Sequence, residues 1–205
     1  MLGIALGARR GDVVIASKFG LHVGEEQTVC DGAAVTQAID DTLAALGTDY
    51  LDLMQIHWPG NIGYIGEPTS WPEANEVVAA LEGAVAAGKL KHYGCCNFGT
   101  EDLAAFAAAG GKPVSNQLPY NLLFRTIESG ILPACIDKNM GVLTYSSLQQ
   151  ALLTGKFTDP VSCFRHTPST CHAAYSRART ISRRLVDERT VGEFVFIQWN
   201  NIGCA

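Results

Sequence analysis

Five short apolar runs in this chain each end at a polar side chain. The clearest extends from Leu51 to Ile56 and is followed at once by His57, Trp58 and a proline. The other four end at Lys18, Asn97, Gln117 and Tyr145. Parallel strands that each present one polar group at the carboxyl end are what an α/β fold with an active site on one rim requires. The pattern therefore predicts a parallel α/β fold whose function lies at that rim.

The segments between these runs have the features of helices. Helices are predicted over 29–46, from Ser70 to Gly88, from Thr100 to the Gly110-Gly111 pair and over 127–139, and strands are predicted to begin near residues 13, 51, 91, 113 and 141. The best-marked helix start is Ser70-Trp-Pro-Glu73, with a serine cap and a proline in the first turn. Right-handed crossovers between parallel strands make either a barrel or a doubly wound sheet. Because no Gly-x-Gly-x-x-Gly follows any strand, the barrel is favoured.

Composition narrows the classes of protein. The 205 residues carry a formal net charge of −5 and are 47% hydrophobic and 17% charged, which is typical of a globular protein. An acidic balance offers no basic face for nucleic acid or an anionic membrane, so neither is expected as a partner. No stretch approaches the roughly 20 apolar residues that span a bilayer. Seven cysteines without a Cys-x-x-Cys pair favour free thiols and a cytoplasmic location.

Two further clusters look like binding motifs, and both are better explained structurally. Four potential zinc ligands lie between Cys163 and His172, but their spacing fits no common site, so no metal is expected. The Gly83–Lys89 segment resembles the start of a phosphate-binding loop. Leu90 stands where that loop needs Ser or Thr, so a helix end is expected there. The adjacent Cys95 and Cys96 are expected to be buried thiols on opposite faces of a strand.

Several segments together resemble the aldo-keto reductases. They are Val13-Val-Ile-Ala-Ser-Lys-Phe-Gly, Leu46-Gly-Thr-Asp-Tyr-Leu-Asp-Leu-Met-Gln-Ile-His-Trp-Pro, Gly88-Lys-Leu-Lys-His-Tyr-Gly-Cys-Cys-Asn-Phe, Asn116-Gln-Leu-Pro-Tyr-Asn, Leu143-Thr-Tyr-Ser-Ser-Leu and Leu153-Thr-Gly-Lys. The match covers roughly residues 2 to 157, in order and with family-like spacing. The resemblance implies a (β/α)8 barrel of the TIM type, which binds NADP(H) in an extended form and reduces a small aldehyde or ketone to an alcohol.

The resemblance also assigns roles to individual residues. It implies that Lys18 lowers the pKa of a catalytic tyrosine and that His57 orients and polarises the carbonyl group, while Trp58 flanks the substrate. The residues that it places around the cofactor are Cys96, Asn97 and Gln117 at the nicotinamide carboxamide, Tyr145 stacked on the ring, and Ser146, Leu148 and Lys156 along the phosphates. Cys96 departs from the family, which usually has a serine there.

Other departures concern the two ends of the chain. The family places its catalytic tyrosine and an aspartate before a helix within which this sequence begins, and no tyrosine of this chain matches the acid. About five of eight strands are recognisable. We therefore expect a partial barrel over 1–157 and a divergent tail over 158–205, as in a fragment, an incomplete gene model or a degenerate member of the family. Two functions remain open: a reductase impaired by loss of the tyrosine and the aspartate, and a non-catalytic relative that binds nucleotide or a partner.

Overall fold

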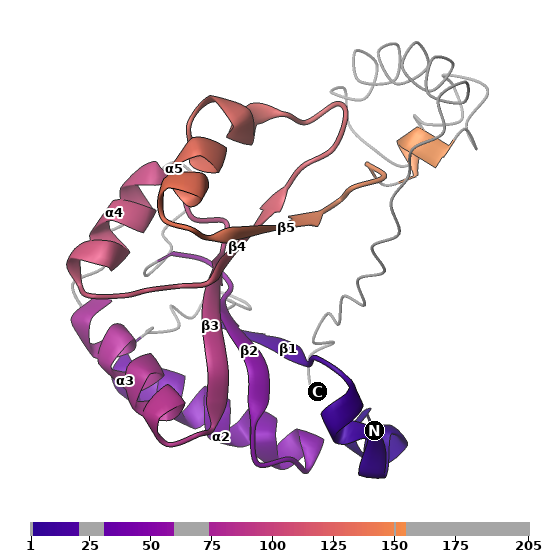
Figure 1. Cartoon of the computed structure of the whole chain (residues 1–205), viewed down its shortest axis with the longest axis vertical. Coiled ribbons are helices and arrows are strands. Elements are labelled where there is room, and N and C mark those ends of the chain that lie inside the picture. The colour runs from indigo at the N-terminus through magenta and orange to yellow at the C-terminus, as the bar shows by residue number, and fades with distance from the viewer. Residues whose placement is uncertain (1, 21–30, 60–73, 150, 155–205) are drawn as a thin grey trace, which may run out of the picture. The chain divides into compact units, whose positions relative to one another are not determined.

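A computed structural model describes residues 2–20, 31–59, 74–149 and 151–154, which form a five-stranded sheet in the order β1-β2-β3-β4-β5 (Figure 1). The strands are β1 (Ala16–Phe19), β2 (Leu51–Ile56), β3 (Leu90–Cys96), β4 (Ser115–Pro119) and β5 (Gly141–Tyr145). The α-helices are α1 (Leu2–Leu6), α2 (Gly32–Leu46), α3 (Ala74–Ala86), α4 (Thr100–Ala108) and α5 (Ile131–Asp137). Three 3-10 helices complete the set: η1 (Gly7–Asp12), η2 (Thr126–Ser129) and η3 (Leu152–Thr154). Strands β1 to β4 pair in parallel, as the alternation of strand and helix predicted.

The chain divides into two compact units. The first comprises residues 1–118 and 127–143, and the second comprises residues 119–126 and 144–205. Strands β4 and β5 each begin in the first unit and end in the second.

Capping residues explain the ends of helix α2. The Asp31 side chain accepts a hydrogen bond from the backbone N–H of Ala34 at 2.8 Å, which satisfies one of the free donors of the first turn. Gly47 ends the helix in the left-handed conformation, with φ of 62°, as its position in the sequence predicted. Val35, Ile39 and Leu43 are buried along one face, which packs against the sheet and α3.

The other predicted helices agree with the structure in part. Helix α4 begins at Thr100, where the Asp102 carboxylate accepts a hydrogen bond from the Gly99 N–H at 2.8 Å. The predicted Ser70–Glu73 start lies outside the described residues. The prediction of one continuous helix over 127–139 is wrong, because Gly130, at φ −157° and ψ −55°, separates η2 from α5. Pro133 lies in the first turn of α5. Backbone N–H groups in a first turn have no acceptor within the helix, so proline, which lacks this group, is tolerated there.

The predicted start of the first strand is also wrong. Strand β1 begins at Ala16, which pairs with Leu53, and not near Val13. Val14 is 82% exposed. The Ile15 N–H donates to the Asp52 side chain and not to the backbone of β2, so regular pairing begins only at the next residue, although the apolar run begins earlier.

The register of the strands defines two faces of the sheet, because residues that pair across a parallel ladder point to the same side. Phe19, Ile56, Cys95 and Asn116 pair in one row, and the first three belong to the apolar core beneath the helices. Helices α2 to α5 cover this face (Figure 1). Lys18, Gln55 and Gly94 pair in the next row and point to the opposite face.

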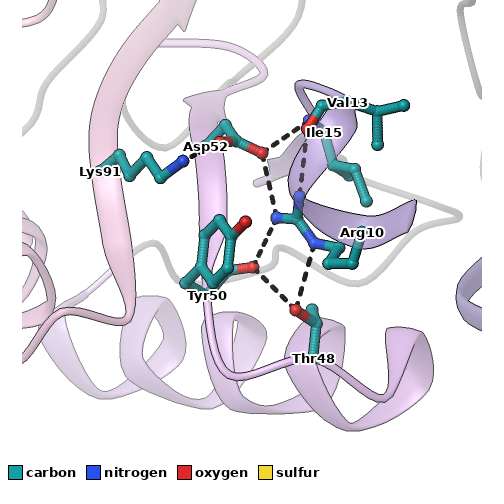
Figure 2. A network of polar contacts seen from close by, with 7 residues as sticks. All are labelled: Arg10, Val13, Ile15, Thr48, Tyr50, Asp52 and Lys91. Atoms are coloured by element: carbon teal, nitrogen blue, oxygen red, sulfur yellow. Dashed lines mark hydrogen bonds and ion pairs between the residues drawn. The ribbon is translucent and has the colours of Figure 1, made fainter. Parts of the chain in front are cut away.

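The amino ends of the strands are joined by a network around the buried Asp52 carboxylate (Figure 2). Its oxygens accept hydrogen bonds from the Ile15 N–H at 2.9 Å and from Arg10 at 3.0 Å, and Lys91 approaches to 2.7 Å. The Arg10 guanidinium also donates to the Tyr50 carbonyl at 2.8 Å and lies 4.0 Å from the centre of the Tyr50 ring. The network therefore ties η1 to β2 and β3.

Candidate active site

The carboxyl ends of the strands in the first unit bring several of the predicted site residues together. Lys18 lies on the face opposite the helices, in the row of Gln55 and Gly94. Two residues further along the strands, His57, Cys96 and Gln117 point to the same face, and Cys96 pairs with Gln117. The His57 N–H donates to the Phe19 carbonyl at 2.8 Å, so the ladder continues to the imidazole-bearing residue. The sequence suggested that Lys18 and Gln117 end their strands. In the structure both residues lie within the strands, before the last residue.

His57 is half-buried, and its surroundings favour the neutral imidazole. Burial lowers the pKa of His57 below its ordinary value of 6.5, and the positive charge of Lys18 lowers it further. The imidazole is stacked beside the Trp58 indole, with ring centres 6.2 Å apart and an interplanar angle of 17°. A neutral imidazole next to a lysine can donate a hydrogen bond to a carbonyl oxygen without carrying a charge itself.

Asn97 connects His57 to the end of β3. Its backbone has φ of 64°, in the left-handed region that asparagine tolerates better than most residues. Its Nδ2 donates to the His57 carbonyl at 3.0 Å and to Cys96 Sγ at 3.2 Å, while its backbone N–H donates to the Gln117 carbonyl at 3.0 Å. Three of the predicted site residues are therefore held together through Asn97.

Cys96 is buried, as expected, and so is Cys95 on the opposite face. Burial raises the pKa of the Cys96 thiol to about 11, although Lys18 acts in the opposite direction. The thiol is consequently neutral near pH 7 and serves as a weak hydrogen-bonding group.

Asn116, which was not predicted from the sequence as a site residue, fixes the turn that carries Asn97. Its side chain is completely buried on the helix-covered face. Its Oδ1 accepts from the Phe98 N–H at 3.4 Å and its Nδ2 donates to the Phe98 carbonyl at 3.0 Å. No signal in the sequence distinguished it, because its burial is known only from the structure, and a buried amide requires hydrogen-bond partners.

The second unit holds the remaining predicted residues that are described. Tyr145 ends β5 and is half-buried, and its carbonyl accepts from the Tyr120 N–H at 3.3 Å. Ser146 and Leu148 follow in an exposed turn, with Leu148 59% exposed. Lys156 lies outside the described residues, as does the Cys163–His172 cluster.

Neither a metal centre nor a membrane span is found in the part of the chain that the structure describes. No group of three or more His, Cys, Asp or Glu side chains there is arranged to hold a metal ion. No helix among these residues is both long and apolar enough to cross a bilayer.

Comparison with known proteins identifies the family. The model of the Aldo/keto reductase family matches residues 1–188. The chain therefore belongs to the aldo/keto reductase family, which confirms the resemblance noted in the sequence. It is 34% identical to the aldo-keto reductase YhdN of Bacillus subtilis over 154 residues, covering 74% of this chain and 43% of that protein. It is 32% identical to the methylglyoxal reductase YeaE of Escherichia coli, covering 74% and 48%. The chain thus spans about half the length of the curated relatives it matches.

Solved structures show the same fold. The glycerol dehydrogenase AKR11B4 from Gluconobacter oxydans is 29% identical, with a TM-score of 0.70, over 90% of this chain and 57% of that one. An aldo/keto reductase from Klebsiella pneumoniae, in complex with NADP and acetate, is 33% identical, with a TM-score of 0.58, over 81% and 52%. The predicted α/β fold of the barrel type is confirmed, and the described residues form part of that barrel.

Proposed function

We propose that this chain is an NADP(H)-dependent oxidoreductase that reduces a small aldehyde or ketone to an alcohol. The observation that carries the proposal is the position of Lys18, His57 and Gln117 on one face of the sheet, at or near the carboxyl ends of their strands. The proteins to which this chain is similar include a methylglyoxal reductase and aldo/keto reductase structures in complex with NADP or NADPH.

The donor groups at this rim fit a nicotinamide cofactor. A carboxamide needs both a donor and an acceptor, and the side-chain amide of Gln117 offers both. Asn97 is held beside it through its backbone hydrogen bond to the Gln117 carbonyl. When bound, the reduced nicotinamide supplies the hydride. We assign the ring-stacking role to Tyr145 and the phosphate contacts to Ser146, Leu148 and Lys156.

The chain's own side chains then act on the substrate. The neutral His57 imidazole donates a hydrogen bond to the carbonyl oxygen and orients it, and the Lys18 ammonium stabilises the negative charge that develops there. Trp58, stacked beside His57, provides an apolar wall for the substrate.

The general acid that would protonate the carbonyl oxygen is not supplied by Tyr50 or Tyr93. Tyr50 packs under Arg10 at the amino ends of the strands, and the Tyr93 hydroxyl lies on the helix-covered face, bonded to Glu82 at 2.6 Å. Neither can reach the rim where His57 lies. General acid catalysis commonly contributes about 10²–10⁴-fold, so the 205-residue chain alone should turn over slowly.

The test is oxidation of NADPH by an aromatic aldehyde, together with a fluorescence titration of NADPH. The proposal predicts saturable binding and slow oxidation that His57→Ala abolishes, while the exposed His92→Ala, as a matched control, leaves both unchanged. A rate typical of intact family members would show that another residue supplies the proton. Absence of NADPH binding would refute the proposed function.

Binding without turnover would favour the second candidate, a nucleotide-binding relative that is not a catalyst. It is supported by the position of Asn97 beside Gln117 at the rim, together with the expectation that no tyrosine of the sequence matches the acid. The same two measurements separate the candidates, because only the reductase requires turnover that depends on His57.

A further inference from the structure

Asn121, just beyond the end of β4, is the centre of a small hydrogen-bond network in the second unit. Its side chain is buried, although the residues that follow it are largely exposed. Oδ1 accepts from the backbone N–H groups of Leu123 and Phe124, each at 2.9 Å. Nδ2 donates to the Ser146 carbonyl at 3.0 Å and to Gln149 Oε1 at 2.6 Å. Two donors and two acceptor sites are the full capacity of an amide, so this side chain is completely satisfied.

The Ser146–Gln149 turn depends on this network. Ser146 has φ of 53° and Gln149 has φ of 46°, conformations that cost a residue with a side chain free energy relative to the right-handed region. The Ser146 carbonyl accepts both Asn121 Nδ2 and the Gln149 N–H, the latter at 2.8 Å. Both lone pairs of one carbonyl oxygen are therefore occupied. The orientation of the Ser146 peptide is set by a residue that lies 25 positions earlier in the sequence.

We propose that Asn121 is a positioning residue for cofactor binding: it holds the Ser146–Gln149 turn in the conformation that receives the phosphates of the nicotinamide nucleotide. This inference rests on the proposed function, which assigns Ser146 and Leu148 to those phosphates. Asn121 itself is buried while Ser146 and Leu148 are exposed. It therefore acts through the turn and makes no contact with the ligand.

Two variants distinguish the hydrogen bonds that Asn121 accepts from those that it donates. Asn121→Asp keeps an oxygen that accepts from Leu123 and Phe124 but removes the donor to Ser146. Asn121→Ala removes both. Gln37→Ala is the matched control, because it deletes an exposed amide whose hydrogen bond to Asp41 lies within α2. Each protein is titrated with NADPH and with reduced nicotinamide riboside, which has the nicotinamide and ribose but no phosphate.

The proposal predicts that Asn121→Asp and Asn121→Ala each lower the affinity for NADPH about tenfold or more, since each leaves the Ser146 carbonyl without its buried donor. The affinity for reduced nicotinamide riboside and the behaviour of Gln37→Ala should stay within about twofold of the parent, a margin set by the usual size of remote surface effects. Equal losses for both ligands, or an Asn121→Asp variant that binds NADPH like the parent, would overturn the positioning role.

Amide hydrogen exchange provides a readout that needs no ligand. In Asn121→Asp the Gln149 amide should exchange about tenfold faster or more, because its acceptor is no longer held in place. Amide exchange in helices α2 and α3 should not change. Unchanged exchange at Gln149 would overturn the inference even if the cofactor binds. Failure of the parent chain to bind NADPH, with faster exchange at Gln149, would instead refute the proposed function alone, and Asn121 would still be shown to position the turn.

Discussion

Replacing Asp52 with asparagine tests the network at the amino ends of the strands. The asparagine has the same shape and can still accept the Ile15 N–H, but it cannot neutralise Arg10. The side chains of Arg10 and Asp52 are 15% and 8% exposed, so solvent screens their ion pair little. Breaking a buried pair from one side costs about 3–5 kcal/mol, because the remaining charge stays buried. The free energy of unfolding of a native domain is about 5–15 kcal/mol, so Asp52→Asn should remove a large share of it.

The measurement is urea unfolding at pH 7, followed by circular dichroism, with Asp40→Asn as the control. Asp40 also pairs with a lysine, Lys89, but both side chains are at least 40% exposed. Such surface pairs are worth about 0–1 kcal/mol. If the two variants lost similar amounts of stability, below about 1 kcal/mol each, the Asp52 network would not hold the strands together and the reasoning would be refuted.

The loss of stability in Asp52→Asn should depend on pH. Burial raises the pKa of Asp52, but the hydrogen bonds from Ile15, Lys91 and Arg10 outweigh it and hold that pKa below its ordinary value of 3.8. A carboxyl whose pKa is lowered by folding stabilises the protein fully above the pKa of the unfolded chain. That stabilisation disappears as the pH falls through the lower, folded-state pKa. The gap in unfolding free energy between the parent and Asp52→Asn should therefore persist at neutral pH and shrink below about pH 4.

Three further outcomes are expected. Lys18→Met should raise the pKa of His57 toward its ordinary value of 6.5, and an unchanged imidazole titration by NMR would contradict this. Gly94→Ala should destabilise the chain by about 1–3 kcal/mol, because the added β-carbon would clash with Ser115 Oγ. Ser115→Ala in the same chain should recover part of that loss in thermal unfolding, and simple additivity would exclude the clash. Asn116→Leu should lower the free energy of unfolding in urea by about 1–3 kcal/mol, because it removes both side-chain hydrogen bonds to the Phe98 backbone, and an unchanged free energy would show that these bonds do not stabilise the fold.

The features that were predictable from the sequence are those encoded by neighbouring residues. Gly47 was expected to end a helix, and it does so because left-handed backbone is nearly free of cost for glycine. His57 and Asn97 follow their strands directly, since the apolar run and the polar residue are contiguous. The break at Gly130 was missed because the apolar spacing over 127–139 continues through it. Only the backbone conformation of the glycine shows that the helix stops and restarts.

The groups that hold the site in place could not be found in this way. Asn116, Asn121 and Asp52 bond to Phe98, Ser146 and Ile15, which lie 18, 25 and 37 positions away, so these partners cannot be inferred from neighbouring residues. In the sequence Asp52 and Asn121 are single polar residues beside apolar ones and Asn116 stands between Ser115 and Gln117, and ordinary surface positions have the same patterns. Burial distinguishes the two cases, because a buried amide or carboxylate without partners would destabilise the fold. The hydrogen-bond partners of these three residues are therefore known only once the chain is folded.

Residues that stabilise the fold and residues proposed to act on the substrate lie at opposite ends of the same strand. In β2, Asp52 lies near the amino end and anchors η1 and β3, whereas His57 follows the carboxyl end. Five residues of extended chain span roughly 16 Å, and burial and Lys18, without a contribution from Asp52, lower the pKa of His57. The charge of Asp52 therefore has little direct influence on His57, and the two ends can be altered independently as long as the sheet remains folded. Asn116 is the exception: it lies in the same row as Phe19 and Ile56, yet it holds the backbone beside Asn97. A substitution at Asn116 should consequently affect stability and cofactor binding together, and a substitution at Asp52 should affect stability alone.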